Sequence, residues 1–189
     1  NLKKELSVIE KDMSEIGVKL HEFRCMSAKD LEVRIKEELS YVGLEKAIIK
    51  IDVNLSEIAN SRGYDDVQFL ISANPGEPLK PLEKVLSGGE LSRIMLALKS
   101  VAAQADGVDT LIFDEIDTGI SGETANRVAK KMAVISKDHQ VIAITHLPQI
   151  AAMADSHFEI EKNVEENETV TSIHPLSEED SVRELARML

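Results

Sequence analysis

The amino-acid sequence predicts an α/β protein with a parallel sheet in its core, preceded by a long amphipathic helix. Two apolar runs, TLIFDE (110–115) and QVIAITH (140–146), have the length of buried strands, and a helical pattern over about 122–137 joins them. A strand, a helix and a second strand at this spacing form a βαβ unit, whose strands are parallel and buried on both faces. The first residues of the chain instead repeat their apolar side chains with a helical period.

The amino-terminal segment has a heptad pattern. Its apolar residues alternate spacings of four and three over three repeats: Leu2, Leu6, Ile9, Met13, Ile16, Leu20 and Phe23. Such a row fits a coiled coil, and it also fits an amphipathic helix that lies on a globular core. A second amphipathic helix is expected over about 28–42, beginning after a cap at Ser27.

Further elements follow from local patterns along the rest of the chain. Alternation of apolar and polar residues predicts strands over 46–55 and 65–73, and NPGEP (74–78) predicts a type II turn with Pro75 and Gly76 in its central positions. The remaining expected elements are a helix over about 88–105, strands over 156–162 and 169–174, and a helix over 177–189. The sequence therefore predicts a mixed fold in which the helical arm comes first.

Composition and charge restrict the functional classes. The chain has 189 residues, a net charge of −12 and a single cysteine, Cys25, which excludes an internal disulfide and fits a cytoplasmic setting. Residues 1–50 hold ten basic and ten acidic side chains, so the excess acid lies in 51–189, a surface that repels phosphate backbones. No apolar run reaches the roughly 20 residues that span a bilayer, so we expect no membrane partner. Any affinity for DNA is therefore expected outside this part or in an assembled dimer.

Two side chains are expected at one edge of the sheet. Glu115 and His146 directly follow the two predicted parallel strands, whose carboxyl ends lie at the same edge, where open α/β sheets bind ligands. Asp114 could hold Mg²⁺ and Glu115 could polarise an attacking water, as in metal-assisted phosphoryl chemistry. The alternatives are an acidic loop that caps the next helix and a structural histidine.

Two glycines begin the helix expected at 88. Ser87 and Glu90 have the S-x-x-E spacing of a capping box, which would explain the helix start without any ligand. Gly88 and Gly89 leave backbone N–H groups uncovered at the positive end of the helix dipole, which suits a phosphate. We expect the helix start to be both a cap and a phosphate site, because the capping residues can themselves bind the phosphate. A capping box alone would not need two glycines.

The sequence contains no G-x-x-x-x-G-K-[ST] loop. Nothing else in the chain is expected to cradle the β- and γ-phosphates of a nucleotide. The chain is therefore expected to supply half of a nucleotide site and to be inactive as an isolated ATPase.

Four ordered motifs resemble the carboxyl-terminal half of an ABC-type ATPase head. They are LSGGE (86–90), LIFDEID (111–117), TGISG (118–122) and ITH (144–146). The longer strings FLISANPGEPLKPLEKVLSGGELSRIMLALKS and THLPQIAAMAD resemble a bacterial recombination and repair branch related to the structural-maintenance-of-chromosomes (SMC) proteins. The resemblance covers essentially the whole chain. It implies that residues 1–26 are the end of an antiparallel coiled-coil arm and residues 27–189 are the carboxyl-terminal lobe of a P-loop ABC/SMC head without its P-loop.

The resemblance implies a role for the LSGGE segment between two heads. Ser87, Gly88 and Gly89 match the signature motif, which contacts the γ-phosphate of ATP bound to the opposite head, and Glu90 completes the motif as a nucleotide-binding residue. Each site would thus be completed in trans when two heads close on two ATP molecules.

The same resemblance implies roles for four residues at the sheet edge. Asp114 matches the Mg²⁺-associated acid, Glu115 the catalytic base and His146 the switch histidine that senses the γ-phosphate. Asp117 begins the segment equivalent to the D-loop, which crosses the dimer interface, and it is expected to be a nucleotide-binding residue there. This segment reads DTGISG where transporter ATPases have an SALD type, so no role is carried beyond Asp117.

The expected function is ATP hydrolysis with Mg²⁺ by an SMC-like protein in recombinational repair of DNA double-strand breaks. The implied partners are a second head of the same protein in an ATP-dependent homodimer, the amino-terminal P-loop half of the same chain, and DNA through the full-length protein, in the cytoplasm at the nucleoid. Alternatives are a non-catalytic coiled-coil and dimerisation module and an SMC-like or ABC ATPase whose substrate is not DNA. A metallohydrolase has less support, because Asp114, Glu115 and a distant His146 do not form the three-ligand set of a catalytic zinc.

Overall fold

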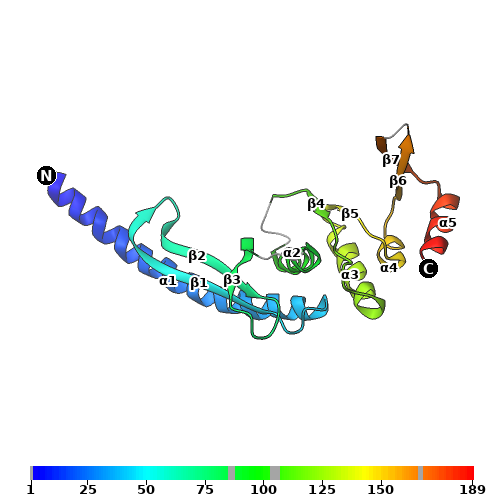
Figure 1. The fold of residues 1–189 in the computed structure, drawn as a ribbon. Coiled ribbons are helices and arrows are strands. Elements are labelled where there is room, and N and C mark those ends of the chain that lie inside the picture. Colours follow the sequence, from blue (N-terminus) through cyan, green and yellow to red (C-terminus); the bar gives the residue numbers. More distant parts are fainter. Residues whose placement is uncertain (1, 85–87, 103–106, 166–167) are drawn as a thin grey trace. The chain divides into compact units, whose positions relative to one another are not determined.

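A computed structural model describes residues 2–84, 88–102, 107–165 and 168–189 (Figure 1). The chain divides into two compact units, one formed by residues 1–40 and 44–86 and the other by residues 41–43 and 87–189. Its elements in chain order are α1 (Leu2–Tyr41), β1 (Ile48–Asn60), β2 (Gly63–Ser72), β3 (Lys80–Pro81), the 3-10 helix η1 (Leu82–Lys84), α2 (Gly88–Ala102), β4 (Thr110–Phe113), α3 (Gly122–Ile135), β5 (Gln140–Ala143), α4 (Pro148–Ala151), β6 (Phe158–Glu165), β7 (Glu168–Pro175) and α5 (Glu178–Met188).

Helix α1 is continuous over 40 residues, so the expected cap and helix start at Ser27 are wrong. No glycine or proline lies between Gly17 and Gly43, and a serine inside a helix costs only a few tenths of a kcal/mol, about 0.5, relative to alanine. Ile35 and Leu39 are buried and extend the helical period past Ser27. The end of the arm at residue 26 and the start of the head at residue 27 stay a prediction.

The heptad row of α1 is mostly exposed within the described part of its own unit. Six of its seven residues are exposed, namely Leu2, Leu6, Ile9, Met13, Ile16 and Phe23, and Leu20 is half-buried. The residues that α1 buries are Gly17, Ala28, Ile35 and Leu39. The helix is confirmed, and its coiled-coil partner stays a prediction.

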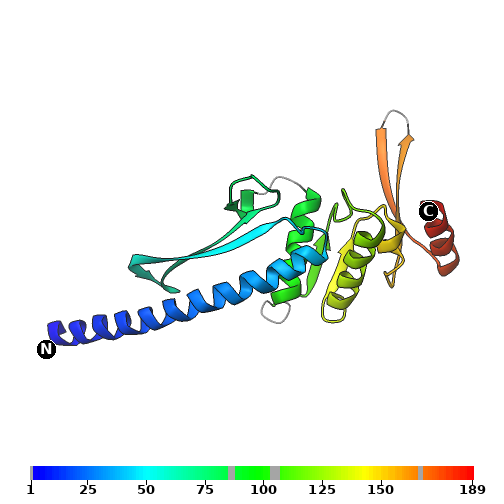
Figure 2. The same cartoon turned by 90° about the horizontal axis from the view of Figure 1, so that it is seen from below.

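The expected strands of the first unit form an antiparallel hairpin, β1–β2, that runs alongside α1 in Figures 1 and 2. Its register pairs Ile49 with Ile71 and Ile51 with Phe69, and β3 adds a short third strand beside β2. The expected type II turn is confirmed, because the Glu77 N–H donates to the Asn74 carbonyl at 3.2 Å and Gly76 has a φ of +86°.

A buried carboxylate attaches the hairpin to α1. Asp65 of β2 accepts a hydrogen bond from Arg24 Nη1 at 2.8 Å and lies 2.6 Å from His21 Nδ1, and only 1% of its side chain is exposed. Arg24 also donates through Nη2 to the Arg62 carbonyl at 2.8 Å. One α1 turn thus holds both strand β2 and the loop that precedes it.

The second unit contains the predicted βαβ unit. Strands β4 and β5 are parallel, as expected, and α3 crosses between them and lies beside both in Figures 1 and 2. Leu111, Phe113 and Val128 belong to the buried core of this region. The expected burial of both strand faces is wrong, because Ile112 is 68% exposed and Ile142 45% exposed. No described element of this unit covers the face that these two residues share.

The carboxyl-terminal segment forms the expected two strands and a helix. β6 and β7 pair antiparallel, with Ile160 opposite Ile173. Ser177 caps α5, because its hydroxyl oxygen accepts a hydrogen bond from the Asp180 N–H at 3.2 Å. Such a bond satisfies one of the free N–H groups in the first turn of a helix. Among the described residues, no helix is both long and apolar enough to cross a bilayer.

Candidate functional site

The parallel register brings the two predicted sheet-edge segments together. Phe113 pairs with Ala143, and the Ile144 N–H donates to the Phe113 carbonyl at 3.0 Å, so both strands end at the same level. Glu115 and His146 follow these ends directly, and their expected placement at one edge is confirmed.

Asp117 connects the two segments at this edge. Its Oδ2 accepts from the Thr145 hydroxyl at 2.5 Å and from the His146 backbone N–H at 2.7 Å, and it lies 3.0 Å from His146 Nδ1. Only 2% of Asp117 is exposed. One buried carboxylate therefore holds the start of the loop after β5 and the ring of the histidine.

The His146 side chain is 73% exposed, although its Nδ1 faces Asp117. Nε2 is therefore the ring nitrogen that does not face this carboxylate. The geometry orients this histidine without burying it.

Asp114 and Glu115 are both exposed at the end of β4. Glu115 has a φ of +55°, a left-handed conformation that is uncommon for a residue with a side chain, and its carbonyl accepts from the Thr118 N–H at 3.0 Å. The Asp114 carbonyl accepts from the Ser92 hydroxyl of α2 at 2.6 Å. A tight turn thus displays two adjacent carboxylates beside α2.

The helix expected at 88 is confirmed as α2, which begins at Gly88, while Ser87 and with it the expected capping box lie outside the described residues. A Cβ on Gly88 would come within 2.3 Å of Glu115 Oε2, and a Cβ on Gly89 within 2.8 Å of Thr118 Cβ and 2.9 Å of the Glu115 carbonyl oxygen. Close packing against residues 115 and 118 therefore gives the two glycines a steric reason within this chain, besides the capping and phosphate-binding roles expected from the sequence. The nucleotide-binding roles of Ser87, Gly88, Gly89 and Glu90 stay predictions.

Arg93 of α2 is a residue of this site that the sequence argument missed. It is 5% exposed, and its Nη1 donates to the Ile116 carbonyl at 3.2 Å and to the Thr118 carbonyl at 2.8 Å. Burial lowers the pKa of the guanidinium, and the charges of Glu90 and Asp117 oppose that shift. The sequence did contain an indication that Arg93 is buried. It lies one helical turn after Gly89 and one before Ala97, on the face that α2 buries.

The donor chemistry fits Mg²⁺ and phosphate only in part. Asp114 and Glu115 supply exposed carboxylate oxygens, and Mg²⁺ commonly takes one or two carboxylates and completes its shell with water and substrate phosphates. Over the described ranges, no three His, Cys, Asp or Glu side chains gather in a group that could hold a metal ion. The residues therefore fit a metal that arrives with a nucleotide.

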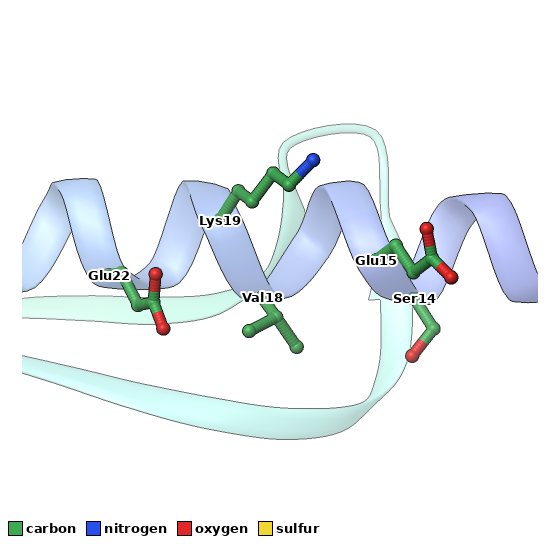
Figure 3. A pocket seen from close by; sticks show the side chains of 5 residues that line it. All are labelled: Ser14, Glu15, Val18, Lys19 and Glu22. Atoms are coloured by element: carbon green, nitrogen blue, oxygen red, sulfur yellow. The ribbon is translucent and has the colours of Figure 1, made fainter.

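A separate surface pocket is found on the first unit. Figure 3 shows its lining, which comes from α1 alone: Ser14, Glu15, Val18, Lys19 and Glu22. None of these residues belongs to the motifs at the sheet edge.

Comparison with curated proteins relates the whole chain to one group of repair proteins, although no family profile matches it. The chain is 41% identical to DNA repair protein RecN of Bacillus subtilis (strain 168) over 204 aligned residues, which cover 100% of this chain and 35% of that protein. RecN of Vibrio cholerae is 40% identical over 189 residues, with 100% and 34% covered. The chain belongs to the RecN family, as a carboxyl-terminal part. It spans about a third of the length of these RecN relatives.

Solved structures give the fold to which the RecN-family chain belongs. The Smc head domain of Pyrococcus yayanosii, with a coiled coil and joint, has a TM-score of 0.64 at 21% identity over 98% of this chain and 34% of that chain. An Smc head of Pyrococcus furiosus, bound to the carboxyl-terminal domain of ScpA, has a TM-score of 0.57 at 22% identity, covering 99% and 44%. A structure described for ATP-driven dimerization and DNA-stimulated activation of SMC ATPases has a TM-score of 0.50 at 20% identity, covering 89% and 96%. The fold is therefore the carboxyl-terminal half of an SMC-type head, as the sequence predicted.

Proposed function

We propose that the protein containing this chain is an SMC-like ATPase of DNA repair and that this chain supplies half of its nucleotide site. RecN relatives that match the whole chain support the repair role, and the SMC-type fold supports an ATPase head. Because the chain spans about a third of its relatives, the P-loop half is expected in the remainder of the protein.

One observation carries the assignment. Glu115 and His146 lie at the carboxyl edge of one parallel strand pair, and buried Asp117 orients the histidine there. This edge is where open α/β sheets bind ligands. An acid and an oriented histidine at this position suit phosphoryl transfer to water.

Each residue has a distinct chemical role in this proposal. Glu115 accepts the proton of the attacking water, since its carboxylate is exposed on a tight turn. Asp114 would help to hold a nucleotide-bound Mg²⁺, which would supply charge neutralisation at the phosphates. His146 contacts the transferred phosphoryl group through Nε2, the nitrogen that Asp117 leaves open.

The start of α2 acts on a different nucleotide. Ser87, Gly88 and Gly89 bind the γ-phosphate of ATP held by a second copy of the head, where the helix dipole favours an anion. Two heads thus close on two ATP molecules, and hydrolysis lets them reopen. DNA binding belongs to the full-length protein, because the acidic excess of residues 51–189 opposes it here.

The test is Glu115→Gln in the full-length protein, with Glu123→Gln of α3 as the matched control because Glu123 is also exposed. Glu115→Gln should bind ATP and Mg²⁺, form a persistent head dimer and lose ATP turnover by about 100-fold or more, as removal of a general base does. Turnover at the parental rate would overturn the proposal. The Glu123 variant should keep parental turnover.

A non-catalytic coiled-coil and dimerisation module is the second candidate. The exposed heptad row of α1 favours it. Mixing this chain with an amino-terminal fragment that carries the P-loop separates the two functions. ATP hydrolysis that appears only in the mixture and disappears with Glu115→Gln supports the ATPase, whereas association without hydrolysis supports the module.

A further inference from the structure

Arg93 ties the start of α2 to both sides of Asp117. Its Nη1 binds the carbonyls of Ile116 and Thr118, which flank Asp117 in the chain. Asp117 in turn binds the backbone N–H and the ring of His146. A continuous series of hydrogen bonds therefore leads from the helix that carries the glycines to the histidine at the end of β5.

Close packing reinforces this connection at the helix start. Gly89 lies against the carbonyl oxygens of Glu115 and Thr118 so tightly that an added Cβ would reach 2.9 and 3.0 Å from them. The Ser92 hydroxyl donates to the Asp114 carbonyl on the same loop. Gly89, Ser92 and Arg93 thus all contact backbone oxygens of residues 114–118, which cannot adjust as the end of a side chain can.

We propose that Arg93 is a positioning residue that makes the start of α2, the loop at Asp117 and His146 move as one body. This inference rests on the proposed function, in which the start of α2 faces the nucleotide of the opposite head and His146 faces the nucleotide of its own head. A displacement of α2 by the partner's γ-phosphate is then passed to His146 through Arg93 and Asp117. Occupancy of one ATP site thereby adjusts the catalytic geometry of the other.

The chemistry of arginine suits this position. Its Nη1 serves two carbonyl acceptors at once, while the buried Nε has no hydrogen-bond partner among the described atoms. A buried guanidinium with an unsatisfied N–H is costly unless its remaining contacts fix it in place. An apolar side chain could fill the same space without this cost. The buried guanidinium therefore indicates that the role of Arg93 is to bind the carbonyls of the loop.

The experiment compares Arg93→Met and Arg93→Lys in the full-length protein, with Arg127→Met of α3 as the matched control. Methionine keeps the length and loses the donors, whereas the lysine nitrogen can still donate to both carbonyls. Arg127 is half-buried and, like Arg93, has an unpaired Nε, but its Nη2 contacts Thr124 within α3. The readouts are thermal unfolding, the stoichiometry and affinity of ATP binding, kcat and KM.

Arg93→Met should bind ATP with parental stoichiometry and an affinity within about twofold, and its kcat should fall about tenfold or more, the size of effect expected when catalytic geometry is misplaced. Arg93→Lys should recover at least about a third of the parental kcat, and Arg127→Met should keep it. Parental kcat in a folded Arg93→Met variant would overturn the inference. Failure of Glu115→Gln to slow turnover would instead overturn the proposed function on which it rests.

A second measurement needs no substitution, and it tests whether the three segments move together even if Arg93→Met does not fold. Hydrogen exchange of the parental full-length protein is followed as a non-hydrolysable ATP analogue and Mg²⁺ are added. The amides of 89–93, 116–118 and 145–147 should gain protection together, with one midpoint of nucleotide concentration, because one body has one transition. Separate midpoints for the three segments would overturn the inference.

Discussion

The Asp117 carboxylate holds His146 at two points, accepting from its backbone N–H at 2.7 Å and lying 3.0 Å from its ring Nδ1. The two residues are 29 positions apart, and α3 lies between them in the chain. The backbone of His146 is thereby tied to Asp117, while 73% of its side chain stays exposed. The orientation of the histidine thus depends on a residue that does not itself face solvent.

Asp117→Asn should loosen the segment at His146. The asparagine amide has no charge and only one acceptor oxygen. The hydrogen bonds that the Asp117 carboxylate accepts would therefore weaken, and hydrogen bonds to a charged group are worth about 1.5–3 kcal/mol. Hydrogen exchange in the full-length protein should show a lower opening free energy for the amides of 145–147, and ATP turnover should fall with it. The control is Asp109→Asn, an exposed aspartate at the other end of the strand pair, which should change neither. Unchanged protection in the Asp117 variant would contradict the role of this carboxylate.

Gly89→Ala should destabilise the contact between α2 and the loop after β4. Alanine favours a helix by about 1 kcal/mol over glycine, but the new Cβ would lie 2.8–3.0 Å from Thr118 Cβ and two backbone oxygens. Overpacking against backbone costs about 1–3 kcal/mol, so the steric cost outweighs the helix preference. Thermal unfolding and hydrogen exchange of α2 measure the difference.

Gly107→Ala is the matched control for that substitution. A Cβ on Gly107 meets nothing within 4 Å, and its φ lies outside the left-handed region, so stability should change by less than about 0.5 kcal/mol. If Gly89→Ala were as stable as Gly107→Ala, the close approach at the start of α2 would be refuted.

The sequence predicted the helices, strands and turns that follow from local residue patterns. Apolar runs of strand length around a helical pattern located β4, α3 and β5, and the topology of a βαβ unit then placed Glu115 and His146 at one edge. The turn at Pro75 and Gly76 was likewise readable, because a proline followed by a glycine fits the backbone angles of a type II turn.

The contacts that join distant segments were not predictable in the same way. The ring of His146 meets Asp117 through side-chain geometry, which has no period along the chain. Arg93 was not considered in the sequence analysis. A charged residue on a helix is usually solvated, and only the place of Arg93 on the buried face of α2 distinguishes it. The exposure of Ile112 was missed for another reason, because periodicity shows that a side chain is apolar but not whether this chain contains the surface that covers it.

The last prediction concerns Asp65, the buried carboxylate that joins the hairpin to α1. Burial by itself raises the pKa of Asp65, but the hydrogen bonds and charges of Arg24 and His21 outweigh it, and the net pKa is lowered from its ordinary value of 3.8. A carboxyl with a lowered folded-state pKa adds stability that is complete above its unfolded pKa and is lost as pH falls through the folded one. The attachment of β2 to α1 should therefore be unaffected at neutral pH and weaken below a pH of about 4.

Asp65→Asn tests this contribution, with Asp66→Asn as the matched control because Asp66 is exposed on the same strand. At pH 7 the Asp65 variant should lower the opening free energy of the β1 and β2 amides by about 1.5–3 kcal/mol, since it removes the acceptor charge from two hydrogen bonds. The difference between parent and variant should shrink below pH 4, because the parental carboxyl then takes up a proton and loses the same charge. A difference that stays constant down to pH 2 would show that packing, and not the charge of Asp65, holds the hairpin on α1.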